Sequence, residues 1–304
     1  MLQYIMNSYS KEKSLVSLQY EILVNLVKQM DLNDLMEFRK TNKFVDTILE
    51  EIACDFLVKY NLTNRGNLLY HYIDYDCSSI EKITIYYEKI YNEKKLYINN
   101  LNLKELPLLP NVERLDCRNN QLTKLPSGMK SLVELNCDNN QLTVISSDMN
   151  SLVCLDCDHN QLTRLPDGMV KLSVLYCKNN NLTSLPNDID SLISLDCVKN
   201  RLSRLPIGMV RLCKLFCGDN RLTSLPEDIT SLEILHCQNN QLKSLPDEII
   251  FLEVLHCQNN LLTKLPNGMN SLNELYCDNN QLTKLPNDLE SLGTLSWYNN
   301  PGNL

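Results

Sequence analysis

From about residue 94 onward, apolar and polar positions follow a pattern that repeats with a period of 20 residues along the chain. In nine repeats a leucine stands two residues before a cysteine, and Trp297 takes the cysteine position of the last repeat. The cysteines of this column stand at positions 117, 137, 157, 177, 197, 217, 237, 257 and 277. Residues two apart on an extended segment share one face, so each repeat predicts a short strand that buries its leucine and cysteine. Stacked repeats place these strands side by side in a parallel sheet.

The rest of each repeat predicts how the chain leaves one strand and returns to the next. An asparagine follows every cysteine position by three residues. Its amide can donate to backbone carbonyls that the bend would otherwise leave without partners. A Leu-Pro pair then favours an extended path, because proline presets φ and cannot donate to a ladder. The Met, Ile or Leu that follows closes the far side of the core.

Taken together, these positions read L-x-x-L-x-C-x-x-N-x-L-T-x-L-P-x-x-M/I-x-S, which resembles the leucine-rich repeat family over residues 94–304. The resemblance implies an α/β solenoid, a leucine-rich repeat horseshoe of about 11 repeats. It implies a parallel sheet on the concave side and an extended or 3₁₀ convex side. The first unit, with Leu96 and Ile98, has Leu101 in place of asparagine, and the next unit follows it one position early.

The cysteine column raises three alternatives: core packing, disulfides and a metal site. Cysteine is often buried as a small apolar residue. Neighbouring strands lie about 5 Å apart, within reach of a disulfide, but parallel strands point adjacent Cβ atoms the same way. A zinc ion needs four converging ligands, and a column is linear. We therefore interpret the column as packing and expect no metal and no cofactor. Cys154 faces away from the core and is the thiol that we expect to react.

The opposite face of the strands is the candidate binding surface, since the resemblance implies a ligand on the concave sheet. The middle column begins at Tyr97 and ends at Ser296, and between them it contains the candidate site residues Asp116, Asn136, Asp156, Tyr176, Asp196, Phe216, His236, His256 and Tyr276. A flanking column adds Glu134, Ile234 and Val254. The first half is acidic and the second is aromatic or aliphatic. Grouped apolar side chains on an exposed face predict a protein-binding site, although strands favour aromatic residues in any case.

Residues 1–93 do not repeat, and their apolar residues follow a helical spacing. We divide them into a helical segment, 1–50, and a helical linker and cap, 51–93, ahead of the solenoid, 94–304. The first segment resembles the F-box, although Gln19 stands where that motif has proline. The F-box-like positions are Leu18, Glu21, Ile22, Leu26, Asp34, Leu35 and Phe44. The resemblance implies a Skp1-like ubiquitin-ligase adaptor as a partner; the alternative is a structural cap.

Charge and composition narrow the function classes further. The net charge is −8, which argues against binding to nucleic acid or an anionic membrane. No apolar run of about 18 residues predicts a membrane span. The start lacks a signal-peptide pattern, so we expect an intracellular protein, cytosolic or nuclear. The asparagine- and isoleucine-rich usage also resembles proteins of large DNA viruses or of AT-rich protists, and a viral origin would place the chain in a host cell.

No pattern of catalytic residues appears in the sequence. There is no glycine-rich phosphate loop, and none of the four histidines pairs with a nucleophile by motif. We therefore predict a non-enzymatic, monomeric substrate-recognition adaptor that holds a protein on the concave face. The alternative is a plain leucine-rich repeat binding or scaffold protein, similar to bacterial effectors, whose N-terminus only caps the solenoid.

Overall fold

The computed structural model describes residues 94–106 and 109–303. The F-box-like positions and the segments 1–50 and 51–93 lie outside the described residues, so the expectations for them stay predictions. The fold described below is that of the repeats.

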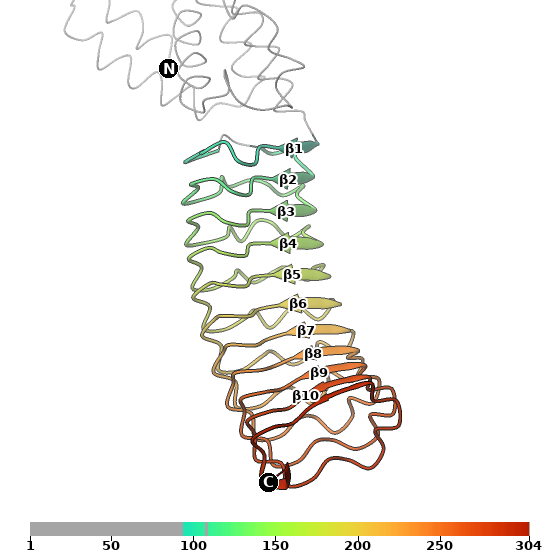
Figure 1. The fold of residues 1–304 in the computed structure, drawn as a ribbon. Helices are drawn as coiled ribbons and strands as arrows, with labels where there is room; N and C mark the ends of the chain where they lie inside the picture. The colour runs from blue at the N-terminus through green and yellow to red at the C-terminus, as the bar shows by residue number, and fades with distance from the viewer. Residues whose placement is uncertain (1–93, 107–108, 304) are drawn as a thin grey trace, which may run out of the picture. The chain divides into compact units, whose positions relative to one another are not determined.

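Within the described residues, eleven strands form one parallel sheet whose spatial order equals the chain order. The strands are β1 (Lys95–Tyr97), β2 (Arg114–Asp116), β3 (Glu134–Asn136), β4 (Cys154–Asp156), β5 (Val174–Tyr176), β6 (Ser194–Asp196), β7 (Lys214–Phe216), β8 (Ile234–His236), β9 (Val254–His256), β10 (Glu274–Tyr276) and β11 (Thr294–Ser296). They stack along one side of the solenoid (Figure 1). Leu96 pairs with Leu115, and Leu115 pairs with Leu135, so the first step is one position shorter than the second. The predicted period and its shorter first step are both confirmed.

The core lies directly behind the strands. In the third repeat, Leu135 and Cys137 point inward from the strand, and Leu142 follows after the bend. Met149 and Leu152 come from the return path and complete the layer, and all five side chains are buried. Burying one leucine stabilises the fold by roughly 2 kcal/mol, and every repeat supplies several.

A ladder of asparagines holds each repeat to the one before it. The side-chain amide of Asn140 donates to the carbonyl oxygens of Cys117 at 3.0 Å and Cys137 at 3.1 Å. Its Oδ1 accepts from the backbone N–H of Leu122 at 3.0 Å. The same bonds recur up to Asn300. The predicted role of this asparagine is confirmed.

The return path is extended and carries turns, and Pro301–Asn303, after the last strand, form the single 3₁₀ turn of the described residues. In four repeats a glycine with positive φ opens the turn, as at Gly168 (φ 93°) and Gly208 (φ 94°). The N–H of Gly168 donates to Asp188 Oδ2 at 2.5 Å, and that of Gly208 to Asp228 Oδ2 at 2.6 Å. These bonds link successive repeats on the side away from the sheet.

Candidate protein-binding face

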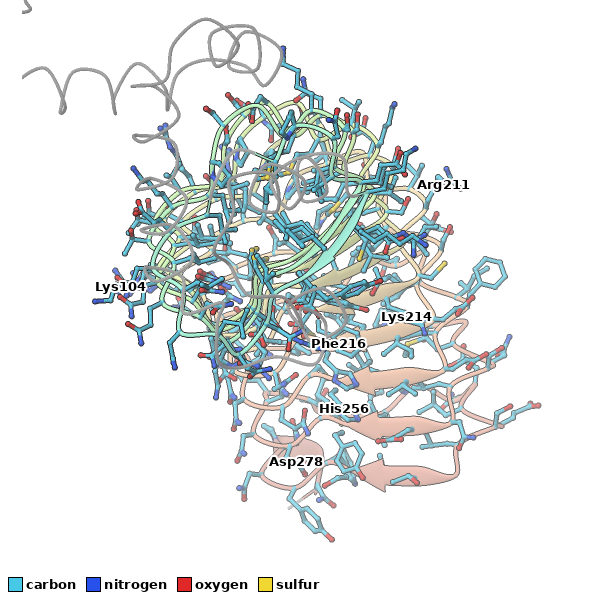
Figure 2. The ribbon with its side chains drawn as sticks, turned by 90° about the horizontal axis from the view of Figure 1, so that it is seen from above. Lys104, Arg211, Lys214, Phe216, His256 and Asp278 are labelled. Atoms are coloured by element: carbon cyan, nitrogen blue, oxygen red, sulfur yellow. The ribbon has the colours of Figure 1, made fainter. Side chains whose placement is uncertain are left out.

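We define the strand face as the outer surface of the sheet, formed by the first and third residues of each strand. The middle residue of β2 to β10 is a buried leucine, whereas its two neighbours are half-buried or exposed. All twelve predicted site residues lie on this face. Lys214 and Phe216 mark the two ends of β7, and His256 lies further along the stack (Figure 2). The alternation of a strand therefore places the predicted residues on one surface.

Four of these residues form a continuous ladder of rings, which we call the ring ladder: Phe216, His236, His256 and Tyr276. Phe216 meets His236 edge-on, with ring centroids 4.9 Å apart. His236 and His256 stack at 3.9 Å, with an angle of 10° between their planes. Tyr276 meets His256 edge-on at 4.7 Å. In-register pairing of β7 to β10 brings the rings together, since each stands directly opposite the next.

His236, inside the ring ladder, is uncharged at neutral pH. Burial, together with the neighbouring His256, lowers the pKa of His236 to about 4. Ile234 and Val254 flank the rings on the same strands, half-buried. The Nε2 atom of His256 lies 2.8 Å from Glu274 Oε1, a partner that the sequence pattern did not single out. The second half of the face is thus an apolar platform with one carboxylate at its border.

In the first, acidic half of the strand face, the charge is distributed differently from what the sequence predicted. Arg114 Nη2 is 3.1 Å from Glu134 Oε1, and Arg118 Nε is 3.4 Å from Asp116 Oδ2. Ion pairs of this exposure add little stability, but they offset the charge of Glu134 and Asp116. The first pair joins neighbouring repeats, because Arg114 and Glu134 stand opposite each other in the strand register.

A second group of carboxylates lies around β4 and β6. Asp158 Oδ1 accepts a hydrogen bond from the backbone N–H of Lys178 at 2.6 Å, and Asp196 Oδ1 accepts one from Val198 at 3.0 Å. Burial, together with the charges of Asp156 and Asp196, raises the pKa of Asp158 to about 7, although the hydrogen bond from Lys178 opposes the shift. Burial also raises the pKa of Asp156 and of Asp196. A cation placed among these carboxylates would relieve their mutual repulsion.

The cysteine column belongs to the core. In the described repeats its nine members are fully buried and unbonded, which confirms the packing interpretation. Burial raises the pKa of Cys237 to about 12, so its thiol stays protonated. Cys154 is half-buried, and burial together with Glu134 and Asp156 raises its pKa, which opposes the reactivity expected of it. A second half-buried thiol, Cys213, was not predicted from the sequence pattern.

Comparisons with known proteins agree with this architecture. The family described as "Leucine Rich repeats (2 copies)" matches residues 110–148, and "Leucine Rich Repeat" matches residues 271–292. YopM, a leucine-rich effector protein from Yersinia pestis, is 31% identical, with a TM-score of 0.68 and coverage of 83% of this chain and 71% of YopM. The chain belongs to the leucine-rich repeat proteins.

Two further structures are similar to this leucine-rich repeat protein. The LRR protein LIC12759 from Leptospira interrogans is 28% identical, with a TM-score of 0.60 and coverage of 70% of this chain and 68% of that one. InlJ from Listeria monocytogenes, whose functional domain includes a cysteine ladder, is 24% identical, with a TM-score of 0.53 and coverage of 74% and 61%. No curated protein gave a significant match. In the described part of the chain, no helix has the length and apolar character to cross a membrane.

Proposed function

We propose that this leucine-rich repeat protein is a non-enzymatic interaction module that binds a partner protein on its strand face. Solenoids of this kind use their extended surfaces for binding. The ring ladder carries the proposal, because four rings and their aliphatic neighbours form an apolar platform on an exposed sheet. The partner places an apolar anchor over Phe216 and basic groups toward Asp156, where charge complementarity favours them.

We further propose that the protein is a substrate-recognition adaptor. In this role the segment from Leu18 to Phe44 binds a Skp1-like protein, and the strand face holds the protein to be ubiquitinated. The F-box resemblance of the sequence supports this role. The similarity to YopM, a leucine-rich effector protein, supports the alternative of an effector-like binding protein without a ligase partner.

The strand-face proposal is tested by changing Phe216, Ile234 and His256 together to Ala, Ser and Ala. These changes remove the centre of the apolar platform, where a few side chains carry most of the binding energy. We expect the affinity for a protein captured with the wild-type chain to fall at least about tenfold, measured by calorimetry. Leu261→Gln is the matched control, since the equivalent Gln241 and Gln281 stand in neighbouring repeats. Unchanged affinity in the triple variant would show that the face is not the site.

The adaptor role is tested separately by affinity capture of the full-length chain from eukaryotic lysate. We expect a Skp1-like or cullin protein to co-purify with the wild type and with the strand-face variant. It should be lost when Leu18 and Ile22 are both changed to Ala. Absence of such proteins from the wild-type capture would refute the adaptor role and leave the effector-like alternative.

A further inference from the structure

Each repeat leaves its strand through a segment that runs from the residue after the cysteine position to the residue before the Leu-Pro pair. Four consecutive segments of this kind, 178–184, 198–204, 218–224 and 238–244, hold six basic residues and one acidic residue, Asp219. The basic residues are Lys178, Lys199, Arg201, Arg204, Arg221 and Lys243. Because the strands stack in register, equivalent positions of these segments lie side by side. We call the four segments the basic flank, and their charge contrasts with the net charge of −8 of the chain.

The turns that follow these segments have the opposite charge. Over 185–191, 205–211, 225–231 and 245–251 they carry six acidic residues and one basic residue, Arg211. The acidic residues are Asp188, Asp190, Glu227, Asp228, Asp247 and Glu248. Lys104, on the corresponding segment of the first unit, lies on the opposite side of the solenoid from Arg211 (Figure 2). The positive charge is therefore confined to a small area, where nearby carboxylates would repel a long polyanion such as nucleic acid or an anionic membrane.

Two arginines stand at the same position of adjacent repeats in the basic flank, Arg201 and Arg221. The other repeats carry Gln121, Gln141, Gln161, Asn181, Gln241, Leu261 and Gln281 there, so the fold does not need a cation at this position. The backbone N–H of Arg201 donates to the carbonyl of Leu182 at 2.9 Å, and that of Arg221 to the carbonyl of Leu202 at 2.9 Å. Both residues are exposed, and neither is among the ion pairs of the described residues. Like charges on neighbouring strands repel each other, unless an anion lies between them.

Lys199 adds a third cation, and it does so at a strained backbone position. Its φ is 55°, whereas the equivalent position of the other full repeats is held by Asn, Asp or His. Lysine lacks the short polar side chain that relieves this conformation. Lys199 is exposed and stands two residues before Arg201. A strained residue that the fold does not require points to a function for its side chain.

The one carboxylate of the basic flank leaves most of this charge in place. Asp219 Oδ1 accepts a hydrogen bond from Asn239 Nδ2 at 2.8 Å. No ion pair of the described residues joins Asp219 to Lys199, Arg201 or Arg221. The three cations are therefore available to an anion from outside the chain.

We propose that the basic flank binds a phosphorylated serine or threonine of a partner protein. Arg201 and Arg221 hold the phosphoryl group, because guanidinium groups donate paired hydrogen bonds to phosphate oxygens. Lys199 adds a charge beside them. A phosphoryl group carries a charge of about −1.5 to −2, so it relieves the repulsion between the two arginines. The proposal does not depend on the strand-face function, because the two surfaces use different residues.

The test uses the immobilised full-length chain and a library of short peptides with phosphoserine fixed at the centre and the flanks randomised. Matched libraries carry Ser or Glu at the centre. We expect the phosphoserine library to be retained more strongly than either of the others. In fluorescence anisotropy, the selected peptides should bind the double variant Arg201→Gln, Arg221→Gln at least about tenfold more weakly than the wild type. The control variant Lys124→Ser, Lys284→Ser loses the same charge from distant repeats and should bind as the wild type does.

Both double variants use residues that other repeats carry at the same positions, so circular dichroism should show an unchanged fold. Lys199→Asn separates binding from folding, because it should weaken binding of the peptides while the free energy of unfolding rises. The inference is overturned if the phosphoserine library is retained no better than the Ser or Glu library. Equal binding of the selected peptides to the wild type and the arginine variant would also overturn it. So would phosphatidylserine vesicles or single-stranded DNA that bind through the two arginines when phosphopeptides do not.

Discussion

One residue of every repeat turns the chain out of its strand with a left-handed backbone. It directly precedes the ladder asparagine, and its φ is 53° at Asn139, 52° at Asn179 and 55° at Lys199. Asparagine tolerates this conformation because its short polar side chain can bond locally, whereas other L-residues are strained by their Cβ. The preference of the repeat for asparagine at this position therefore has a backbone cause, which the sequence analysis did not identify.

Lys199 stands at this left-handed position in place of the preferred asparagine, and a substitution can restore the asparagine. Lys199→Asn should raise the free energy of unfolding by roughly 1 kcal/mol, because it removes the left-handed strain of a lysine. Urea unfolding followed by circular dichroism measures the change. Asn179→Lys, at the equivalent position one repeat earlier, should lower the free energy by a similar amount. Equal stability of the wild type and Lys199→Asn would contradict this account.

The direction in which a side chain points could be predicted from the sequence, but the side chains that it contacts could not. The two-residue period of a strand predicted that Phe216 and His236 point outward and that Cys217 points inward. The contact of His256 with Glu274 and the pairing of Arg114 with Glu134 depend on distances across strands. Side-chain rotamers set those distances, and a list of positions does not contain them.

At the scale of the strand, the ring ladder couples four neighbouring elements. His236 of β8 is held between Phe216 of β7 and His256 of β9. Stacked rings leave little room for water, so protonation of His236 is unfavourable in the folded chain. The packing that makes this face apolar therefore also makes the stability of the repeats depend on pH in the acidic range.

The pH dependence of His236 has a definite sign. Its folded pKa of about 4 lies below the ordinary 6.5, so between these values the unfolded chain takes up a proton that the folded chain refuses. The stability of the folded chain that depends on an uncharged His236 is fully present above pH 6.5 and is lost as the pH falls toward 4. His236→Phe should consequently lose less stability than the wild type when the pH falls from neutral into that range.

The raised pKa of Asp158 acts in the opposite direction, since it favours the folded chain as the pH falls from about 7. The wild type and His236→Phe both contain Asp158, so its effect on stability cancels when the two proteins are compared. Proton NMR of the imidazole gives a direct check. A titration midpoint near the ordinary 6.5 for His236 in the folded protein would show that burial does not control its charge.

Within the described residues, each strand pairs with the strands of the adjacent repeats, and the asparagine ladder makes the same bonds at each step. Removing one complete period should therefore leave the remaining interfaces intact. The chain without residues 259–278 joins Gln258 to Asn279, which keeps the register of every later repeat. We expect it to fold with native circular dichroism and a lower unfolding midpoint.

Removal of half a period is the control for that deletion. Without residues 259–268, the leucines and cysteines of the last repeats no longer face the core formed by the earlier ones. We expect loss of cooperative unfolding or aggregation during purification. If the two deletions behave alike, the single repeat does not act as an independent structural step.

The period, the strand positions and the buried column were all accessible from the pattern of residues, because a repeat of fixed length brings equivalent positions into contact. The tertiary structure decided what those positions do on the surface. Residues about one repeat apart in the chain become neighbours across strands, as His256 and Glu274 do. Burial by such neighbours sets the pKa of His236 and Asp158, and the exposure of Ile207 and Phe251 depends on how each turn projects.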